Sequence, residues 1–377
     1  MSSVTDQALL FANFGAEEGE DDTLPSGRAG RTVLAPLWSF IFDADIALDN
    51  DGELPPRPAW FGESQSLAAF EWLRGARGLV PWLSTMRAQK RADELALKLW
   101  GPSPKSVWQV SDKAWAHEMT TALGLVPADL QRWFLPIAPG LLQDEPRAKE
   151  RIEAHIRSLP PCPNGYTLKP RYGSSGRGRV IVRELPLPDA VCASFRRLAA
   201  RGGAMLEPWL SRTADLSVQM CIGADDVDIL ATTEQLLRPS GMYEGNRGLL
   251  TRDGIRSGTG HDEYLIETGK KIGATLQAAG FRGPCGIDAF TFTHEGTEVL
   301  RPFVELNARF TTGTLAAGII QRAIAAGKIV PGQRWQFGIC PPHGGFEKLA
   351  GVVDVLPLEI GGAALAVCQG GEPVLTR

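Results

Sequence analysis

The chain has 377 residues, 44% of them apolar and 22% charged, which suits two or three domains with hydrophobic cores and excludes disorder throughout. A net charge of −4 gives no general reason to expect a nucleic-acid partner. The six cysteines lack metal-ligand spacing, and no stretch resembles a membrane span or a signal peptide. We therefore expect a cytoplasmic protein with no membrane partner.

The first 111 residues are expected to form two parts. Residues 1–30 contain an acidic run and several glycines, which predicts a mobile acidic tail. Residues 31–111 are predicted to form a small α/β domain. Within it, 32–42 could hold one or two short buried strands, whereas 66–74 and 86–100 have the apolar spacing of helices.

A larger domain is predicted over 112–330. It begins with a helix at 114–123, which Ser111 or Asp112 would cap and Gly124 would end. A β-rich extension is expected at 331–377, with strands at 351–356 and 363–367. The other elements expected are helices at 147–158, 263–279 and 314–325, strands at 166–170, 179–182, 204–210, 215–222 and 227–233, and a loop at 238–260.

A glycine-rich loop, GSSGRG at 173–178, follows the strand that carries Lys169. Its small residues let backbone N–H groups approach phosphate oxygens, because no Cβ stands in the way. The loop has neither the P-loop pattern nor the strand–helix setting of a dinucleotide fingerprint, so a mobile surface turn is an alternative. Lys169 and several nearby arginines concentrate positive charge there, which favours a polyphosphate ligand.

The extended segment EPWL at 207–210 offers groups of a different kind. Its backbone could hydrogen-bond the edge of an adenine ring while Trp209 or Leu210 covers the face. Asp215 lies further along and could accept hydrogen bonds from ribose hydroxyls. An ordinary carboxylate at a strand edge is the alternative for Asp215.

Residues 283–313 are predicted to contain an antiparallel hairpin, because two alternating runs flank the turn sequence HEGT. The first strand carries Asp288. The second carries Glu305 and Asn307, which are two residues apart and so share a face. These oxygen-bearing side chains suit Mg²⁺ or Mn²⁺, and Arg309 adds a cation beside them. A solvated hairpin with a salt bridge is the alternative.

The order of these features from 111 to 325 resembles that of the ATP-grasp superfamily. The run VELNAR at 304–309 is similar to that family's Glu-x-Asn-x-Arg metal-binding strand, and GID at 286–288 is similar to the strand that supplies its other metal carboxylate. The resemblance implies that Lys113 and Lys169 contact the nucleotide. It also implies roles in adenine and ribose binding for the hinge and for the acid that follows it.

The resemblance further implies the fold and the domain organisation. We expect an α/β (α+β) ATP-grasp fold with ATP between two lobes, preceded by a small pre-ATP-grasp domain at 31–111. The ATP-grasp domain itself would span 112–330, with the glycine-rich loop at 173–178 and the metal hairpin at 285–309. Neither the segment 238–260 nor the C-terminal extension identifies a subfamily.

The function that the resemblance implies is ATP-dependent carboxylate–amine ligation. An acyl phosphate would form, and an amine would displace its phosphate to give an amide or peptide bond, ADP and phosphate. The substrates would be a small-molecule carboxylic acid and an amine, which include amino acids and peptides, and by analogy the chain would form a homodimer. The alternatives are a phosphotransferase of the same fold and a non-catalytic nucleotide-binding protein.

The predicted site residues have three roles. Arg309 and Lys169 are expected to be catalytic. The nucleotide-binding residues are expected to be Lys113, Lys169, Gly173, Ser174, Ser175, Gly176, Glu207, Trp209, Leu210 and Asp215. The metal ligands are expected to be Asp288, Glu305 and Asn307, and the presence of all three argues against a non-catalytic protein.

Overall fold

The protein, described here by a computed structural model, divides into two compact units. Unit 1 comprises Met1–Val107, Asp215–Asp288 and Asn307–Arg377, and unit 2 comprises Trp108–Ala214 and Ala289–Leu306. Every described helix is too short or too polar to cross a lipid bilayer. The residues that the structure describes are 8–16, 25–42, 46–49, 54, 58–61, 78–173, 178–238, 243–340, 352–356 and 362–368.

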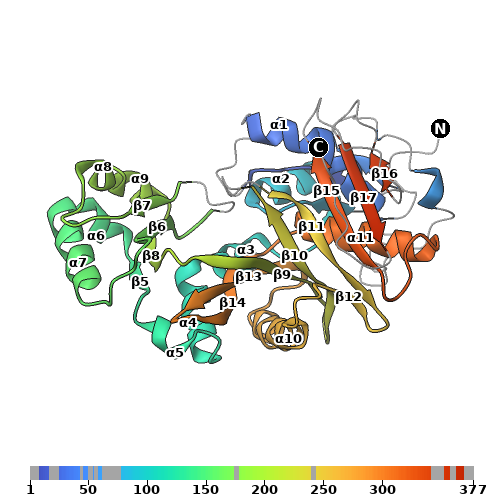
Figure 1. The fold of residues 1–377 in the computed structure, drawn as a ribbon. Coiled ribbons are helices and arrows are strands. Elements are labelled where there is room, and N and C mark those ends of the chain that lie inside the picture. The colour runs from blue at the N-terminus through green and yellow to red at the C-terminus, as the bar shows by residue number, and fades with distance from the viewer. Residues whose placement is uncertain are drawn as a thin grey trace. The chain divides into compact units, whose positions relative to one another are not determined.

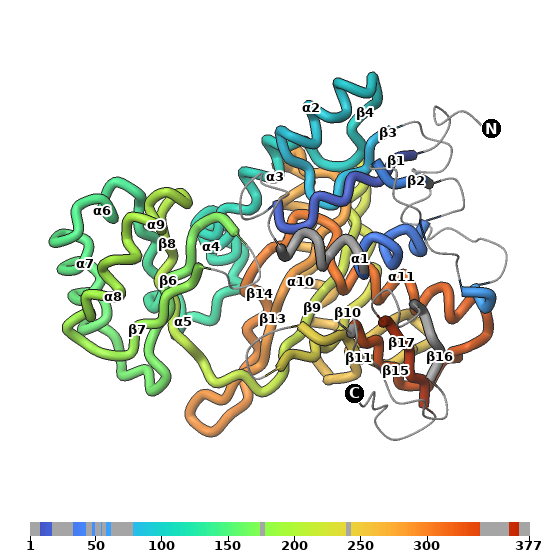
Figure 2. The backbone as a smooth tube through the Cα atoms, turned by 90° about the horizontal axis from the view of Figure 1, so that it is seen from above, coloured from blue at the N-terminus to red at the C-terminus, as the bar shows by residue number. Residues whose placement is uncertain are grey.

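The first sheet of unit 1 has four strands, β1 (Ala8–Phe11), β2 (Ile46–Leu48), β3 (Gly78–Pro81) and β4 (Lys98–Leu99). They are parallel and lie side by side in the order β2-β1-β3-β4 (Figure 2). Helix α2 (Met86–Glu94) makes the crossover from β3 to β4. Its Ala88 and Ala92 pack against Leu9, Phe11 and Leu79, which gives the α/β arrangement predicted for this region.

Two predictions for the N-terminal region are wrong. Helix α1 (Pro25–Phe40) occupies most of 32–42, where short strands were expected. Leu37, Trp38 and Phe40 are all buried, and a run that is buried on most sides has no period that distinguishes a helix from a strand. The mobile tail is also wrong for 8–11, which form β1, and for 25–30, which begin α1. The acidic run at 17–22 and the expected helix at 66–74 lie outside the described residues.

The second sheet has nine strands in the order β14-β13-β9-β10-β12-β11-β15-β17-β16. The pairings from β9 to β16 are antiparallel, apart from that between β10 and β12. The boundary between the units falls within β9, β13 and β14. The strands are β9 (Arg212–Ile222), β10 (Val227–Leu237), β11 (Tyr243–Thr251), β12 (Gly254–Arg256), β13 (Gly283–His294), β14 (Thr297–Asn307), β15 (Arg334–Cys340), β16 (Val352–Leu356) and β17 (Gly362–Cys368).

The predicted hairpin is confirmed, because β13 and β14 are neighbours in the sheet and only two residues separate them. These residues, Glu295 and Gly296, have φ angles of 49° and 78°. Positive φ at both central positions is typical of the type I′ turn that suits the twist of two-residue hairpins.

The loop predicted at 238–260 is wrong, since β11 and β12 lie within it. Two glycines of β11 are required by close strand contacts. A Cβ at Gly245 would lie 2.0 Å from the Phe337 carbonyl oxygen, and one at Gly248 would lie 2.3 Å from the Arg256 carbonyl oxygen. Glycine in a strand can therefore indicate the close approach of a neighbouring backbone as well as a loop.

Helices α10 (Asp262–Ala278) and α11 (Thr312–Ala325) cover opposite faces of this sheet (Figure 1). Gly269 of α10 lies against Val218, whereas Gly313 of α11 lies against Gln219. Successive side chains of a strand point to opposite faces, so the two helices must lie on different sides of β9. Both helices are close to those predicted from the apolar spacing.

The C-terminal extension is β-rich, as the sequence predicts. The expected strands at 351–356 and 363–367 correspond to β16 and β17, which join β15 at the end of the nine-stranded sheet. The domain boundaries proposed from the sequence stay a prediction.

Unit 2 contains a four-stranded antiparallel sheet with the order β5-β8-β6-β7, formed by β5 (Leu135–Ile137), β6 (Tyr166–Pro170), β7 (Val180–Val182) and β8 (Ala204–Pro208). Residues such as Leu168, Leu206 and Ile152 build its core. Helices α6 (Pro139–Gln143), α7 (Glu145–Arg157), α8 (Asp189–Cys192) and α9 (Phe195–Ala200) lie beside this sheet (Figure 1).

Helix α4 (Lys113–Ala122) confirms the predicted start and stop signals. The Asp112 side chain accepts a hydrogen bond from the Ala114 N–H and so caps the helix. Gly124 has a φ of +69° just after the helix ends, a conformation that glycine adopts without strain. Two further helices of this part of the chain are α3 (Pro104–Val110) and α5 (Ala128–Gln131).

Candidate functional site

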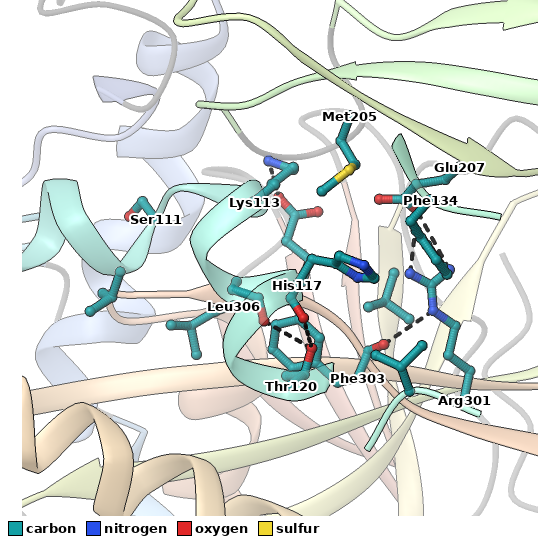
Figure 3. Close-up of a pocket in the computed structure, with 15 residues that line it drawn as sticks. Ser111, Lys113, His117, Thr120, Phe134, Met205, Glu207, Arg301, Phe303 and Leu306 are labelled. Atoms are coloured by element: carbon teal, nitrogen blue, oxygen red, sulfur yellow. Dashed lines mark hydrogen bonds and ion pairs between the residues drawn. The ribbon is translucent and has the colours of Figure 1, made fainter. Parts of the chain in front are cut away.

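Unit 2 contains a pocket formed mainly by α4, β8 and β14 (Figure 3). Its walls combine apolar surface with several ionisable groups. The lining residues are Val110, Ser111, Lys113, Ala116, His117, Thr120, Val126, Phe134, Met205, Glu207, Arg301, Phe303, Val304, Glu305 and Leu306. A concave, largely apolar site with a few convergent polar groups is typical of small-molecule binding.

Glu207, on β8, is a buried carboxylate with two cationic partners. Its Oε2 accepts a hydrogen bond from Lys169 Nζ at 2.9 Å and another from Arg301 Nη2 at 3.3 Å. Lys169 reaches it from the adjacent strand β6, because β6 and β8 are paired. Pairing and hydrogen bonding of this kind offset the cost of removing charges from water.

The charge state of Glu207 follows from these contacts. Burial by itself raises the pKa of a carboxyl group, but the positive charges of Lys169 and Arg301 outweigh this effect and bring the pKa of Glu207 down to about 2. Burial lowers the pKa of the Lys169 ammonium, and the negative charge of Glu207 opposes that change. Glu207 is therefore ionised at neutral pH.

Lys113 is the second lysine of the site and the first residue of α4. Its Nζ lies 2.9 Å from Glu305 Oε1 and donates a hydrogen bond of 2.6 Å to the carbonyl oxygen of Gly173. The structure thus joins the predicted lysine to a predicted metal ligand and to the first residue of the glycine-rich loop. Ser174, Ser175 and Gly176 lie outside the described residues.

The start of α4 is also tied to the strand that leads into this loop. The guanidinium of Arg171 donates through Nε to Asp112 Oδ1 at 2.8 Å and through Nη2 to Oδ2 of the same carboxylate. This bidentate pairing fixes the residue before Lys113 relative to β6.

His117 and Arg301 are pocket residues that the sequence interpretation missed. Burial lowers the pKa of His117, whose ring lies 4.7 Å from that of Phe134, so its neutral form is favoured. Arg301 stacks over the Phe134 ring at 4.7 Å. The sequence held a signal for Arg301. It lies four residues before Glu305 on β14, and strand residues an even number apart share a face, so both line the pocket.

The hinge residues Trp209 and Leu210 are not among the described residues that line this pocket. The ring of Trp209 lies under the Arg179 guanidinium at 4.7 Å, and the backbone N–H of Trp209 donates to the Gly165 carbonyl oxygen at 2.9 Å. Leu210 packs against the core of unit 2. Their assignment to adenine binding stays a prediction.

Three of the predicted residues come together in unit 1. The two oxygens of Asp288 accept hydrogen bonds from Gln235 Nε2 at 2.8 Å and from Asn307 Nδ2 at 3.1 Å. Arg309 Nη2 donates in turn to Asn307 Oδ1 at 3.2 Å. Asp215 lies opposite Gln235 in the pairing of β9 with β10. Gln235 is a further residue of this set that the sequence did not reveal.

The oxygen donors of the predicted metal set fit a hard divalent cation. The described part of the chain has no group of three His, Cys, Asp or Glu side chains that could hold a metal by themselves. Mg²⁺ does not need such a group, because it usually takes one or two carboxylates and completes its shell with phosphate oxygens and water. Asp288 and Asn307 belong to unit 1 and Glu305 to unit 2.

Comparison with known proteins gives one match among curated sequences. No protein-family profile matches the chain. The [butirosin acyl-carrier protein]–L-glutamate ligase of Niallia circulans is 29% identical over 147 residues, which are 39% of this chain and 33% of that protein. The match therefore covers about a third of the length of this relative.

Solved structures match nearly the whole chain. The biotin carboxylase of Campylobacter jejuni, in a complex described as β,γ-ATP, has a TM-score of 0.56 at 14% identity and matches over 100% of this chain and 93% of its own. The biotin carboxylase domain of 2-oxoglutarate carboxylase from Hydrogenobacter thermophilus, a dimer with MgADP, ADP and bicarbonate, has a TM-score of 0.56 at 16% identity over 96% of this chain and 86% of its own. At these identities the likeness establishes the fold.

Proposed function

The chain has the ATP-grasp fold, and on that premise we propose that it is an ATP-dependent ligase that joins a carboxylic acid to an amine. The observation that carries this proposal is the pair of lysines, Lys113 and Lys169, each held on a buried or half-buried carboxylate at the pocket of unit 2. Fixed cations beside an apolar pocket suit a nucleotide, whose base is apolar on its faces and whose phosphates are anionic.

We assign nucleotide binding to unit 2. Lys113 and Lys169 would balance the charge of the phosphates, and Lys113 also donates to the carbonyl oxygen of Gly173, the first residue of the glycine-rich loop. Because Lys113 and Lys169 are already paired with carboxylates, they lose little freedom when a phosphate replaces or joins those partners. Neutral His117 and the apolar walls of the pocket suit the uncharged adenine ring.

Asp288, Glu305 and Asn307 are proposed to hold Mg²⁺, which would neutralise charge on the β- and γ-phosphates. Gln235 holds the Asp288 carboxylate in place through its hydrogen bond. Arg309 is proposed to bind the acid or the phosphate of its activated form, since a planar guanidinium suits either oxyanion.

The proposed reaction has two steps. The carboxylate of the acid attacks the γ-phosphorus of ATP, which forms an acyl phosphate and releases ADP. The amine then attacks the acyl carbon and expels phosphate, which leaves an amide. Neither step requires a covalent link to the protein, so positioning and charge neutralisation are its main contributions.

The proposed substrates are a small carboxylic acid and an amine, such as an amino acid or a peptide. The name of the Niallia circulans relative, an L-glutamate ligase acting on an acyl-carrier protein, supports ligation of an amine to an acyl group. The dimer of the Hydrogenobacter thermophilus domain supports a homodimer. A cytoplasmic location is consistent with the free cysteines among the described residues.

The test is a trapping experiment with hydroxylamine. The purified chain is incubated with ATP, Mg²⁺ and a panel of amino acids, short peptides and other small acids, and ADP and product masses are measured. Hydroxamate formation together with ADP supports the ligase. A stable phosphorylated acceptor without hydroxamate indicates a phosphotransferase instead, and no ADP with any acid overturns the proposal.

Two variants make the trapping experiment specific. Glu305→Gln removes a proposed metal ligand and should abolish ADP formation. Glu150→Gln removes the same charge from an exposed position on α7 and should leave it unchanged. Equal ADP formation by both variants would contradict the metal assignment.

A further inference from the structure

Tyr172 lies between β6, the strand that carries Lys169, and Gly173, the first residue of the glycine-rich loop. Its ring stacks on the indole of Trp108, with 3.9 Å between the ring centroids and 13° between the ring planes. Aromatic pairs stabilise their geometry beyond the area that they bury. The stack therefore holds the side chain of Tyr172 in one orientation just before the loop begins.

Trp108 contributes to this stack rather than to the apolar core. Its side chain is 62% exposed, whereas Val107 and Val110 of the same helix, α3, are buried. The side of α3 that packs on the core is therefore a different one from the side that carries Trp108. What the described contacts of Trp108 show for its ring is the face that it presents to Tyr172.

The turn before β8 holds Tyr172 by a second contact. A Cβ at Gly202 would lie 2.6 Å from Cε2 and 2.7 Å from Cδ2 of the Tyr172 ring, so only glycine allows the ring to lie there. The carbonyl oxygen of Gly203, the next residue, accepts a hydrogen bond from the Arg171 N–H at 3.1 Å. The backbone and the ring are thus both anchored at this turn.

The residues on both sides of Tyr172 are bonded to the start of α4. The Lys113 N–H donates to the Arg171 carbonyl oxygen at 3.2 Å, and Lys113 Nζ donates to the Gly173 carbonyl oxygen at 2.6 Å. The Tyr172 hydroxyl donates to Asp112 Oδ2 at a longer distance of 3.4 Å. The position of the Lys113 ammonium therefore depends on the path of the backbone through 171–173.

Holding this ammonium in place matters for the affinity of a phosphate. A lysine ammonium is a point charge at the end of a flexible stem, and a site that orders it in advance lowers the entropic cost of binding an anion. Lys113 is held by Glu305 and by Gly173. The second of these contacts is the one that the path of 171–173 provides.

We propose that Tyr172 and Trp108 are positioning residues of the nucleotide site. Their stack holds the segment 171–173 so that the Lys113 ammonium is placed for the phosphates of the nucleotide. The two rings act through Lys113 and not by contact with the nucleotide. This inference rests on the proposed function, because it takes Lys113 as a phosphate contact of the ligase.

The test compares ADP with adenosine on the full chain, by calorimetry for ADP and ligand-observed NMR for adenosine. Tyr172→Leu should weaken ADP binding by about tenfold, the usual order for a lost contact to a charged group. It should leave adenosine binding unchanged, because adenosine has no phosphate for Lys113 to contact. A loss of the same size for both ligands, or for neither, would overturn the proposal.

Conservative variants separate the ring from the rest of the side chain. Tyr172→Phe keeps the stack and removes only the long hydrogen bond, so its ADP affinity should stay close to that of the parent chain. Trp108→Leu should weaken ADP binding as Tyr172→Leu does, and Trp108→Phe should restore most of the affinity. Because Trp108 is exposed, its replacement should keep the chain folded.

Tyr264→Leu is the matched control for the loss of an exposed aromatic ring. Tyr264 is 49% exposed and belongs to α10 in unit 1. Its replacement should leave ADP affinity unchanged. An equal loss of affinity in the Tyr264 and Trp108 variants would overturn the positioning role.

A double-mutant cycle tests whether the rings act through Lys113. Lys113→Met should weaken ADP binding by itself. Adding Tyr172→Leu to that variant should cause little further loss, because the ammonium that the ring positions is already absent. Effects of the two substitutions that multiply in full would contradict the proposal.

Failure of this inference is distinguishable from failure of the ligase proposal. Hydroxamate formation with an unchanged KM for ATP in Tyr172→Leu would keep the ligase and overturn the positioning role. ADP binding that depends on Tyr172, in a chain that forms no hydroxamate with any acid, would support the positioning role and remove the ligase.

Discussion

Glu207 is ionised inside unit 2 because Lys169 and Arg301 both donate to it. The two cations differ in their surroundings. Arg301 lies fully within the packed interior, against Phe134 and Phe290, whereas Lys169 comes from the strand that leads to the glycine-rich loop. The Arg301–Glu207 pair is therefore a structural contact, whereas we propose that Lys169 also contacts the nucleotide.

Glu207→Gln should lower the free energy of unfolding at pH 7 by about 3–5 kcal/mol, because it leaves two buried cations without a counter-charge. Urea denaturation of the variant and the parent chain measures the difference. A matched change on the surface, Glu150→Gln, should alter stability by less than about 0.5 kcal/mol. Equal effects of the two substitutions would contradict the buried ion pair.

The same carboxylate predicts a dependence of stability on pH. Its folded pKa of about 2 lies below the reference value of 4.5, so its contribution is present above the unfolded pKa and is lost as the pH falls through the folded pKa. The shift corresponds to about 3 kcal/mol. The stability difference between the parent chain and Glu207→Gln should therefore shrink between about pH 4.5 and pH 2, as urea titrations at several pH values can test.

Lys169→Met should weaken ADP binding by at least about tenfold while the chain stays folded, because Glu207 keeps Arg301 as a partner. Isothermal titration calorimetry measures the affinity. The control is Lys149→Met, which removes a charge from α7 and should leave affinity unchanged. An unaltered affinity for ADP in the Lys169 variant would assign this lysine to structure alone.

Among the elements, helix α11 has an N-terminus that packs on one glutamine of the sheet. Thr311 and Thr314 form a capping box, and both hydroxyls also donate to Gln219 Oε1, at 2.5 and 3.3 Å. A Cβ at Gly313 would lie 2.4 Å from Gln219 Nε2. The glycine in the first turn of this helix is thus required by the amide that packs beneath it.

Gly313→Ala should lower the free energy of unfolding by about 1–3 kcal/mol, the usual cost of overpacking a core, although alanine is the better helix former. Adding Gln219→Ala should recover part of that loss by making room. Gly140→Ala in α6 is the control, because a Cβ there would have no neighbour within 4 Å among the described residues; it should raise stability by up to about 1 kcal/mol. If the double variant is no more stable than Gly313→Ala alone, the proposed contact is wrong.

For the whole molecule, the described residues that line the pocket assigned to the nucleotide all belong to unit 2. Each unit has its own apolar core. The nucleotide should therefore protect unit 2 more than the parallel sheet of unit 1.

Addition of ADP at about a hundred times its dissociation constant should raise the free energy of unfolding by about 2.7 kcal/mol. Hydrogen exchange should slow in α4, β6 and β8 and change little in the parallel strands β1 to β4. Removal of the nucleotide by dialysis should reverse both effects. Protection that is strongest in β1 to β4 would contradict the assignment of the nucleotide to unit 2.

Sequence reasoning succeeded where the signal is local. Asp112 before α4 and Gly124 after it are capping residues, and the alternation on both sides of HEGT is enough for the hairpin of β13 and β14. The failures at α1 and β11 have different causes. An apolar run carries no period when it is buried on most sides, and the glycines of β11 are required by the backbones of neighbouring strands, which the local pattern does not show.

The sequence by itself indicated the ATP-grasp fold and pointed to the two lysines and the oxygen donors as candidate site residues, because each depends on residue types at short spacing. Only the tertiary structure decided that Arg301 and Lys169 share Glu207 and that Gln235 holds Asp288. It also decided that Ser84, Gly101 and Arg309 line one pocket. Such contacts join residues up to hundreds of positions apart. They arise from the packing of strands and helices, which no local pattern records.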